Sequence, residues 1–153
     1  KALGERAVFE NMEKYFIIRT AWLYGEGKNF VKTMISLSEK NKTLRVVSDQ
    51  IGSPTSANEL ARFIVYLIQT DKYGIWHGVC DGSTSWYEFT KEIMKLTGKE
   101  EVEVLPIKSE EYRTKAKRPY FSVLSNKKMH NETDFKIKSW EEALKEYLQK
   151  NKN

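Results

Sequence analysis

The chain holds few of the cysteines and histidines that bind zinc or form disulfides. Its one cysteine, Cys80, has no partner, and its two histidines, His77 and His130, lie far apart in the sequence. Structural zinc sites are built mainly from cysteine and histidine, so no metal site is expected. Cysteine is commonly buried, and we interpret Cys80 as a small core residue. A lone cysteine also agrees with a reducing, cytoplasmic compartment.

Polar loops that follow apolar runs are the stronger candidates for ligand binding. Trp22 ends the apolar run of residues 16–22, where a tryptophan either fills the core or contacts a ligand. Residues 49–55, DQIGSPT, follow a second apolar run and place Gln50 in a polar loop. The glycine and proline of this loop fit a plain connection, and its polar residues equally fit the wall of a pocket. The residues alone do not separate these interpretations.

Two further segments could meet a phosphate group. Residues 25–30, GEGKNF, precede a predicted helix, but Phe30 stands where the third glycine of a dinucleotide-binding fingerprint belongs. We therefore predict Asn29 as a helix cap beside backbone amides that favour anions, rather than a cofactor loop. Residues 115–128, KAKRPYFSVLSNKK, concentrate positive charge. Arg118 precedes a proline and should be extended, so its guanidinium could bind a diphosphate in bidentate fashion. A solvated surface loop is the alternative.

The elements that must position these residues alternate along the chain. Strands are predicted from β-branched and aromatic runs at residues 16–24, 43–48, 74–81 and 101–107. Helices are predicted from apolar spacing at residues 4–15, 29–41, 56–68, 85–98 and 139–150. This alternation predicts an α/β fold, with parallel strands and flanking helices. Ligands bind beyond the carboxyl ends of such strands, so the loops after Trp22, Asp49 and Asp81 are expected to meet.

Three of the predicted helices begin with the same signal. Ser56, Ser85 and Ser139 are each followed three residues later by a glutamate. This spacing is typical of a capping box, in which the hydroxyl accepts from an early helix amide and the carboxylate accepts from the cap amide. After Ser56, apolar residues recur at helical spacing at Leu60, Ala61, Ile64, Leu67 and Ile68.

The composition is that of a soluble globular domain. The 153 residues are 40% hydrophobic and 31% charged, with a net charge of +5. No apolar run is long enough to cross a bilayer, and the first residues lack a signal-peptide pattern, so no membrane partner is expected. Lysine and glutamate alternate along the predicted helices, which is typical of solvated faces and disfavours nucleic acid as a partner. One domain, or one lobe of a larger one, is the simplest organisation.

Taken in order, several segments resemble the dTDP-4-dehydrorhamnose reductases, a branch of the extended short-chain dehydrogenase/reductase superfamily. The resemblance is carried by KALGE, IIRTAWLYG, NFVKTM, VVSDQIGSPTSANELA, GIWHG, SWYEFTKEI and AKRPYFSVLSNKK, which span nearly the whole chain. It implies a Rossmann-type reductase that transfers hydride from NADPH or NADH to the 4-keto group of dTDP-4-dehydro-6-deoxy-L-mannose, giving dTDP-L-rhamnose. The choice between the two cofactors, and the presence of Mg²⁺, stay open at this point.

The resemblance also assigns roles to five residues. The family's catalytic pair is Tyr-x-x-x-Lys followed by a small-Gly-Glu turn, and KALGE matches its end. Lys1 therefore takes the place of the lysine that assists the catalytic tyrosine and binds the nicotinamide ribose. An ammonium lowers the pKa of a nearby phenol, which can then protonate the developing alkoxide. Trp22 takes the place of a substrate-contacting tryptophan, and Asn29, Gln50 and Arg118 fall in segments on the sugar-nucleotide side of the cleft.

On this resemblance, residues 1–153 form a single substrate-binding lobe, the C-terminal part of the enzyme. The dinucleotide-binding half and the tyrosine, four residues before Lys1, lie outside this sequence, so the isolated chain is expected to lack activity. Parallel strands without their neighbours leave open edges, and an isolated chain is expected to aggregate or to form a homodimer. A different class of function stays open, because the same fold serves as a non-catalytic regulatory partner of methionine adenosyltransferase.

Overall fold

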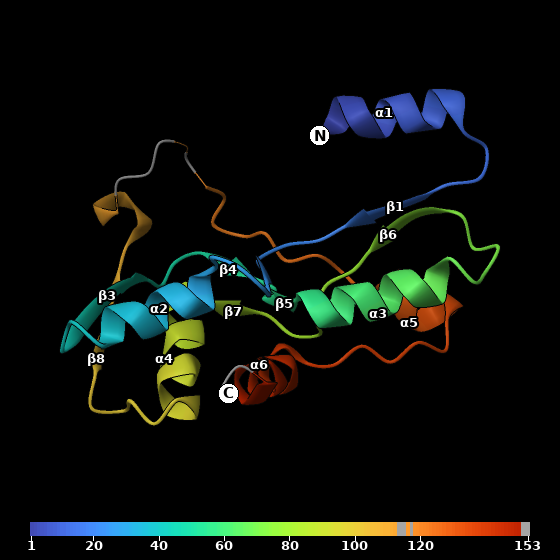
Figure 1. The fold of residues 1–153 in the computed structure, drawn as a ribbon. Helices are drawn as coiled ribbons and strands as arrows, with labels where there is room; N and C mark the ends of the chain where they lie inside the picture. The colour runs from blue at the N-terminus through green and yellow to red at the C-terminus, as the bar shows by residue number, and fades with distance from the viewer. Residues whose placement is uncertain (113–115, 117, 151–153) are drawn as a thin grey trace.

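Strands and helices alternate along the chain, as the sequence predicts (Figure 1). A computed structural model describes residues 1–112, 116 and 118–150. The helices are α1 (Ala2–Asn11), α2 (Phe30–Ser38), α3 (Ala57–Leu67), α4 (Trp86–Leu96), the 3-10 turn η1 (Ser109–Glu111), α5 (Lys127–Glu132) and α6 (Trp140–Lys150). The strands are β1 (Phe16–Arg19), β2 (Leu23–Tyr24), β3 (Thr43–Val47), β4 (Ile51–Gly52), β5 (Thr55–Ser56), β6 (Gly74–His77), β7 (Thr84–Ser85) and β8 (Glu103–Ile107).

Most of the strand pairs are parallel. β1 pairs with β6, with Phe16 opposite Gly74, and β3 pairs with β8, with Thr43 opposite Glu103. β2 and β5 are also parallel, whereas β4 and β7 are antiparallel. Among the described residues three strand pairs of four are therefore parallel. This arrangement confirms the predicted α/β fold with mainly parallel strands and helices packed on them.

The strand predicted over residues 16–24 is in fact two strands. β1 ends at Arg19 and pairs with β6, whereas β2 pairs with β5. The backbone turns at Trp22, whose φ of 47° lies in the left-handed region that interrupts an extended strand. The strand predicted at residues 74–81 is also shorter than expected and ends at His77. Residues 20–22 and 78–81 therefore lie in loops at the ends of β1 and β6 rather than within strands.

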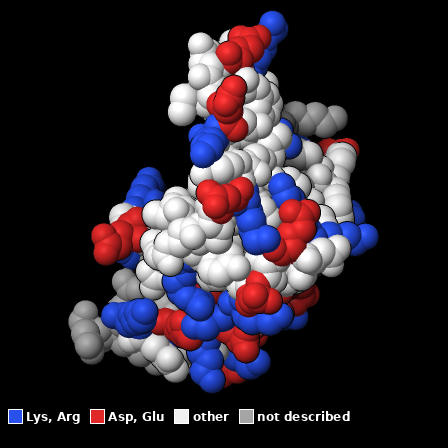
Figure 2. Space-filling view, turned by 90° about the vertical axis from the view of Figure 1, so that its right-hand side faces the viewer, with Lys and Arg blue, Asp and Glu red and all other residues white. Residues whose placement is uncertain are grey.

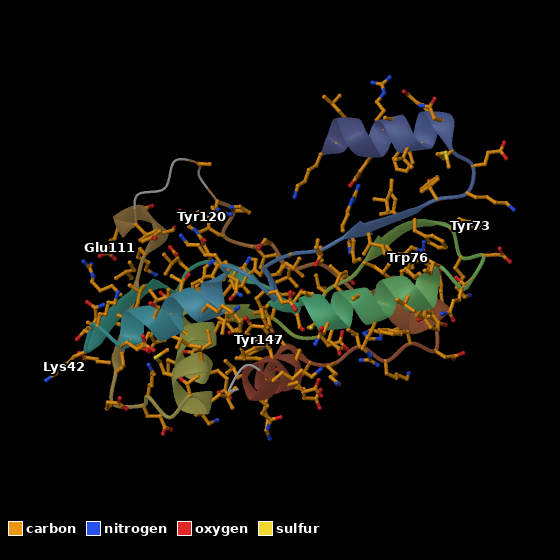
Figure 3. All side chains as sticks on the ribbon, in the orientation of Figure 1. Lys42, Tyr73, Trp76, Glu111, Tyr120 and Tyr147 are labelled. Carbon is orange, nitrogen blue, oxygen red and sulfur yellow. The ribbon has the colours of Figure 1, made fainter. Side chains whose placement is uncertain are left out.

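Two hydrophobic clusters make up the core. The larger one joins α2, α4 and α6 to β3, and Tyr147 and Leu144 belong to it. The smaller one lies beside β1 and β6, where Trp76 is 1% exposed and donates Nε1–H to the Lys72 carbonyl at 2.8 Å (Figure 3). Cys80 is buried in the larger cluster, as predicted, and burial raises the pKa of its thiol to about 12.

One of the three predicted capping boxes is complete. At the start of α6, the Ser139 hydroxyl accepts a hydrogen bond from Glu142 N at 3.2 Å. The Glu142 carboxylate in turn accepts one from Ser139 N at 3.1 Å. Ser85 provides the first half of the device for α4, since its hydroxyl accepts from Glu88 N at 3.0 Å.

The box predicted at Ser56 is wrong in its second half. Ser56 caps α3 with its hydroxyl, but Glu59 is only 2% exposed and its carboxylate turns into the protein. That carboxylate accepts hydrogen bonds from Arg62 Nη1 at 2.8 Å and from Lys138 N at 3.2 Å. A buried carboxylate needs charged or hydrogen-bonding partners, and the chain supplies one from 79 positions further on.

Helix α3 buries only part of its predicted apolar stripe. Phe63 and Leu67 are fully buried against the smaller cluster. Ile64 and Ile68, each one position further on, are 37% and 60% exposed. The helix therefore turns one side to the core and leaves a second apolar side on the surface.

Helix α1 stands clear of the rest of the chain (Figure 1). None of its residues is buried, and Leu3 and Phe9 are 83% and 43% exposed. The helix is tied to β1 by Arg19, which donates two hydrogen bonds to the Glu5 carboxylate at 2.5 and 2.9 Å. These bonds lower the pKa of Glu5. Within the described part of the chain, these apolar side chains leave one face of α1 uncovered.

Charges of both signs are interspersed on the face shown in Figure 2, and neither sign dominates a broad area of it. This is the pattern of solvated helix faces expected from the alternation of lysine and glutamate. Within residues 1–112, 116 and 118–150, no helix combines the length and the apolar character that a membrane span requires.

Candidate functional site

Three loops meet at the carboxyl ends of the strands, where the sequence predicts a site. The loop after β3 contacts the loop after β1, since Gly52 lies against the indole of Trp22. It also contacts the loop after β6, where Ser53 Oγ donates to the Gly82 carbonyl at 3.1 Å. The antiparallel pair of β4 and β7 also joins the loop after β3 to the loop after β6. The predicted meeting of these loops is confirmed.

Trp22 is held in an unusual backbone conformation at this meeting point. Among the described residues it is the one non-glycine residue with a positive φ, at 47°. A bulky residue in this region costs on the order of 1–3 kcal/mol and persists only where its surroundings fix it. Such strain clusters at functional sites, so the backbone of Trp22 independently indicates a functional role for this residue.

The surroundings of Trp22 fix its indole ring from both sides. The ring of Trp86 stacks on it with centroids 3.5 Å apart and an angle of 7° between the planes. On Gly52, a Cβ atom would lie only 2.3 Å from Trp22 Cε2, which leaves no room for a side chain. The packing of the ring within the chain supports a structural role for Trp22. The residue is only half-buried, which also supports contact with a ligand.

The segment that carries Arg118 runs beside β4. Ile51 N donates to the Tyr120 carbonyl at 2.8 Å, and Ser122 N donates to the Ile51 carbonyl at 2.8 Å. Ile51 and Phe121 accordingly form a parallel bridge. Main-chain bonds thus fix a segment that has little regular structure of its own, and Tyr120 lies along it in Figure 3.

Three of the predicted site residues consequently come from joined segments. Gln50 precedes the first residue of β4 and is half-buried, while Arg118 is exposed on the neighbouring segment. The Asp49 carboxylate steadies this loop by accepting from Ser109 N at 2.9 Å and from Ser109 Oγ at 3.1 Å. Trp22 packs against Gly52 of β4, so the segments that carry the indole, the amide and the guanidinium are all joined to β4.

Asn29 has a different position and a structural task. As predicted, it caps α2, because its Oδ1 accepts from Lys32 N at 3.1 Å. Its Nδ2 donates to the Gly25 carbonyl at 2.6 Å and to Tyr147 Oη at 3.0 Å. The amide is therefore already bonded at both ends within the chain, which leaves it little capacity to bind a ligand directly.

Lys1 lies at the start of α1, away from the three loops. Its carbonyl accepts from Glu5 N at 3.1 Å, and its side chain is exposed. Within the described part of the chain, no ion pair or hydrogen bond engages its ammonium group. The structure does not bring Lys1 into contact with Trp22, Gln50 or Arg118, but it leaves the ammonium available to a ligand.

Two surface pockets lie elsewhere. One of about 660 Å³ is lined by residues of α4, β8 and α6, including Glu92 and Trp140, and another of about 490 Å³ lies between α2 and α6. Neither is lined by the predicted site residues, so the site is defined by the meeting of the loops rather than by these hollows. Residues 1–112, 116 and 118–150 contain no group of three or more metal-binding side chains.

The sequence interpretation missed Trp86 and the packing role of Gly52. Trp86 is the first residue of α4, directly after the Ser85 cap. An aromatic residue just after a predicted strand-to-helix connection is a signal that could have pointed to the loop edge. The contact itself, however, depends on the antiparallel pair of β4 and β7, which two-residue strands do not reveal in a sequence.

Comparison with known proteins adds a family. A model described as the RmlD substrate binding domain matches residues 1–153. The spore coat polysaccharide biosynthesis protein SpsK of Bacillus subtilis (strain 168) is 45% identical over 150 residues, which make up 97% of this chain and 52% of that protein.

Two solved structures are similar over nearly the whole chain. A dTDP-4-dehydrorhamnose reductase from Bacillus anthracis str. Ames, in complex with NADP, has a TM-score of 0.93 and 42% identity, and the match covers 99% of this chain and 54% of that one. A reductase of the same name from Clostridium acetobutylicum ATCC 824 has a TM-score of 0.92 and 47% identity, covering 97% and 53%. The chain spans about half the length of the relatives it matches.

Proposed function

The chain belongs to the RmlD substrate-binding domain family, and on this premise we propose that it forms the substrate-binding lobe of a dTDP-4-dehydrorhamnose reductase. The reaction is the reduction of the 4-keto group of dTDP-4-dehydro-6-deoxy-L-mannose to dTDP-L-rhamnose. The observation that supports this proposal is that the segments bearing Trp22, Gln50 and Arg118 are joined through β4, by the packing of Trp22 on Gly52 and by the bridge between Ile51 and Phe121. The similarity to two solved structures that are named as such reductases supports it.

A second lobe completes the enzyme in this proposal. The relatives are about twice as long as this chain, and one of them was solved in complex with NADP. The second lobe would carry most of the dinucleotide site and the catalytic tyrosine, and the apolar side of α1 would face it. The isolated chain would then be inactive. A cytoplasmic location and a role in making cell-surface polysaccharide fit a nucleotide-sugar reductase.

Lys1 is the residue of this chain that would meet the cofactor. When bound, NADPH or NADH supplies the hydride. The exposed ammonium of Lys1 has no partner in the described part of the chain, so it suits a hydrogen bond to a ribose hydroxyl. The same positive charge would favour ionisation of a nearby tyrosine and so help it to release a proton to the substrate oxygen.

The other residues would bind the sugar nucleotide. Arg118 has five N–H donors in a planar fork, which matches the oxygens of a diphosphate. Gln50 offers an amide and Trp22 an indole N–H to sugar or phosphate oxygens. Asn29 would act through the loop it holds, because its own amide is bonded within the chain.

A non-catalytic regulatory subunit of the same fold is the second class of function, and the comparisons do not favour it. The two solved structures described above are named reductases, and both match the chain at more than 40% identity. The residue four positions before Lys1 in the full-length protein discriminates the two, since a tyrosine there favours the enzyme.

The proposal is tested by measuring the affinity of the full-length protein for dTDP by titration calorimetry. Loss of a hydrogen bond to a charged group costs about 1.5–3 kcal/mol, so Arg118→Gln should weaken dTDP binding by roughly 10- to 100-fold. Trp22→Ala should weaken binding of the dTDP-sugar product as well. Lys42→Gln serves as the charge-matched control, because Lys42 precedes β3 at the opposite end from Gln50 (Figure 3). Unchanged affinities in both site variants would contradict the proposed site.

A further inference from the structure

Trp86 is placed by the same short ladder that places Gly52. In the β4–β7 pair, Ile51 lies opposite Ser85 and Gly52 lies opposite Thr84. Trp86 follows directly, as the first residue of α4, where the Ser85 cap fixes the start of the helix. One antiparallel pair therefore carries both of the groups that enclose the Trp22 indole.

The ring of Trp86 is itself supported from behind. Phe30, the first residue of α2, packs against it with centroids 4.4 Å apart and an angle of 44°. Phe30 in turn stacks on Phe89 of α4, which is 1% exposed in the larger core cluster. A chain of aromatic contacts thus runs from the core to Trp22, and Trp86 is the link that touches the strained residue.

This enclosure decides which part of Trp22 can meet a ligand. Trp86 stacks on the indole and the Gly52 backbone lies against it, so little of its ring face is left for stacking by a ligand. In the described part of the chain, Nε1–H of Trp22 has no acceptor, and the residue is half-buried. What remains is the edge of the ring, with one hydrogen-bond donor.

We infer that Trp86 is a positioning residue, which with Gly52 holds Trp22 so that the edge of its indole, and not its face, meets the dTDP-sugar. The inference rests on the proposed function for the contact between Trp22 and the substrate. The strained backbone of Trp22 gives the arrangement its physical sense. Without Trp86, the ring could swing away and the φ of 47° could relax.

A double-mutant cycle in the full-length protein tests this role. Stacked aromatic pairs are worth about 0.5–1.5 kcal/mol beyond their buried area, so Trp86→Ala should raise the KM for the dTDP-4-keto sugar by up to about tenfold. The kcat and the KM for NADPH should stay unchanged. Trp86→Phe should restore most of the loss, because a phenyl ring can still stack. In a Trp22→Ala background, Trp86→Ala should have no further effect.

Tyr87→Ala is the matched control, because Tyr87 is the next residue of α4 and also packs against the larger core cluster. It should lower the melting temperature about as much as Trp86→Ala without raising the KM for the sugar nucleotide. A full loss from Trp86→Ala in the Trp22→Ala background would overturn the positioning role alone. Absence of turnover in the unaltered protein would contradict the proposed function, and the positioning role with it.

Discussion

Gly52→Ala adds a single methyl group against the ring of Trp22. Gly52 is buried, and its φ lies outside the positive range that favours glycine, so alanine introduces no backbone strain there. The new Cβ would lie 2.3 Å from Trp22 Cε2 and 2.6 Å from Nε1. Ordinary contacts between such atoms need about 3.5 Å or more. The indole must therefore move.

The direction of escape is blocked, and this sets the size of the effect. Trp86 lies 3.5 Å behind the Trp22 ring, with Phe30 packed against Trp86 in turn. Overpacking a core typically costs about 1–3 kcal/mol, and a stacked pair that must shift together should fall in the upper part of that range. At roughly 2–4 °C per kcal/mol, the melting temperature should drop by about 4–10 °C.

Differential scanning calorimetry and dTDP titration of the full-length protein measure the two consequences. Gly52→Ala should lower both the melting temperature and the dTDP affinity. Gly78→Ala is the control: its Cβ would lie 2.8 Å from Ile18 Cγ2 and from Leu60 Cδ1, and its nearest neighbours do not include Trp22. That variant should lose stability and keep its affinity. A Gly52→Ala protein as stable and as tight-binding as the unaltered one would refute the reasoning about the enclosed ring.

Two further predictions concern ionisable groups. Burial raises the pKa of Cys80 from 9.0 to about 12, so the native thiol should resist Ellman's reagent at pH 8 until the protein is unfolded. The free energy of unfolding should fall as the pH rises above 9.0, because the thiol then ionises in the unfolded chain but not in the native protein. Rapid labelling of the native protein would contradict this. The Lys138 ammonium, 2.5 Å from Glu146, lowers the pKa of that carboxyl from 4.5, so the contribution of the pair to stability is present above pH 4.5 and is lost as the pH falls through the lowered value. The difference in melting temperature between the unaltered protein and Glu146→Gln should therefore shrink in acid, and a difference that stays constant from pH 7 to pH 3 would show that the pair contributes nothing through its charge.

The sequence predicted those features that depend on neighbours along the chain. The cap at Ser139 is complete because donor and acceptor lie three residues apart. The cap at Ser56 is incomplete because the Glu59 carboxylate is bound by Arg62 and by Lys138, a distant residue that no local pattern indicates. Hydrophobic periodicity likewise predicted α3, but not which of its apolar sides the core would cover.

In the candidate site, too, local features were predictable from the sequence and long-range contacts were not. The meeting of the loops at the strand ends follows from the alternation of strands and helices, and was predictable. The stacking of Trp22 on Trp86 was not, since it depends on a left-handed backbone at Trp22 and on a two-residue strand pair. The bridge between Ile51 and Phe121 was equally hidden, because residues 118–124 have no periodic pattern. Long-range main-chain bonds with weak local signals account for most of what was missed.

The order of the strands also has a consequence for how the chain folds. β1 pairs with β6 and β3 pairs with β8, and in each pair the second strand lies roughly 60 positions further along the chain. Forming either pair therefore closes a large loop and should be slow compared with the formation of the helices. The two pairs interleave along the chain, in the order β1, β3, β6 and β8. During synthesis β1 and β6 can therefore pair before β8 is made, whereas β3 and β8 can pair only after both strands of the other pair are present. A break anywhere between β3 and β6 separates both pairs at once, whereas a break after β8 separates neither.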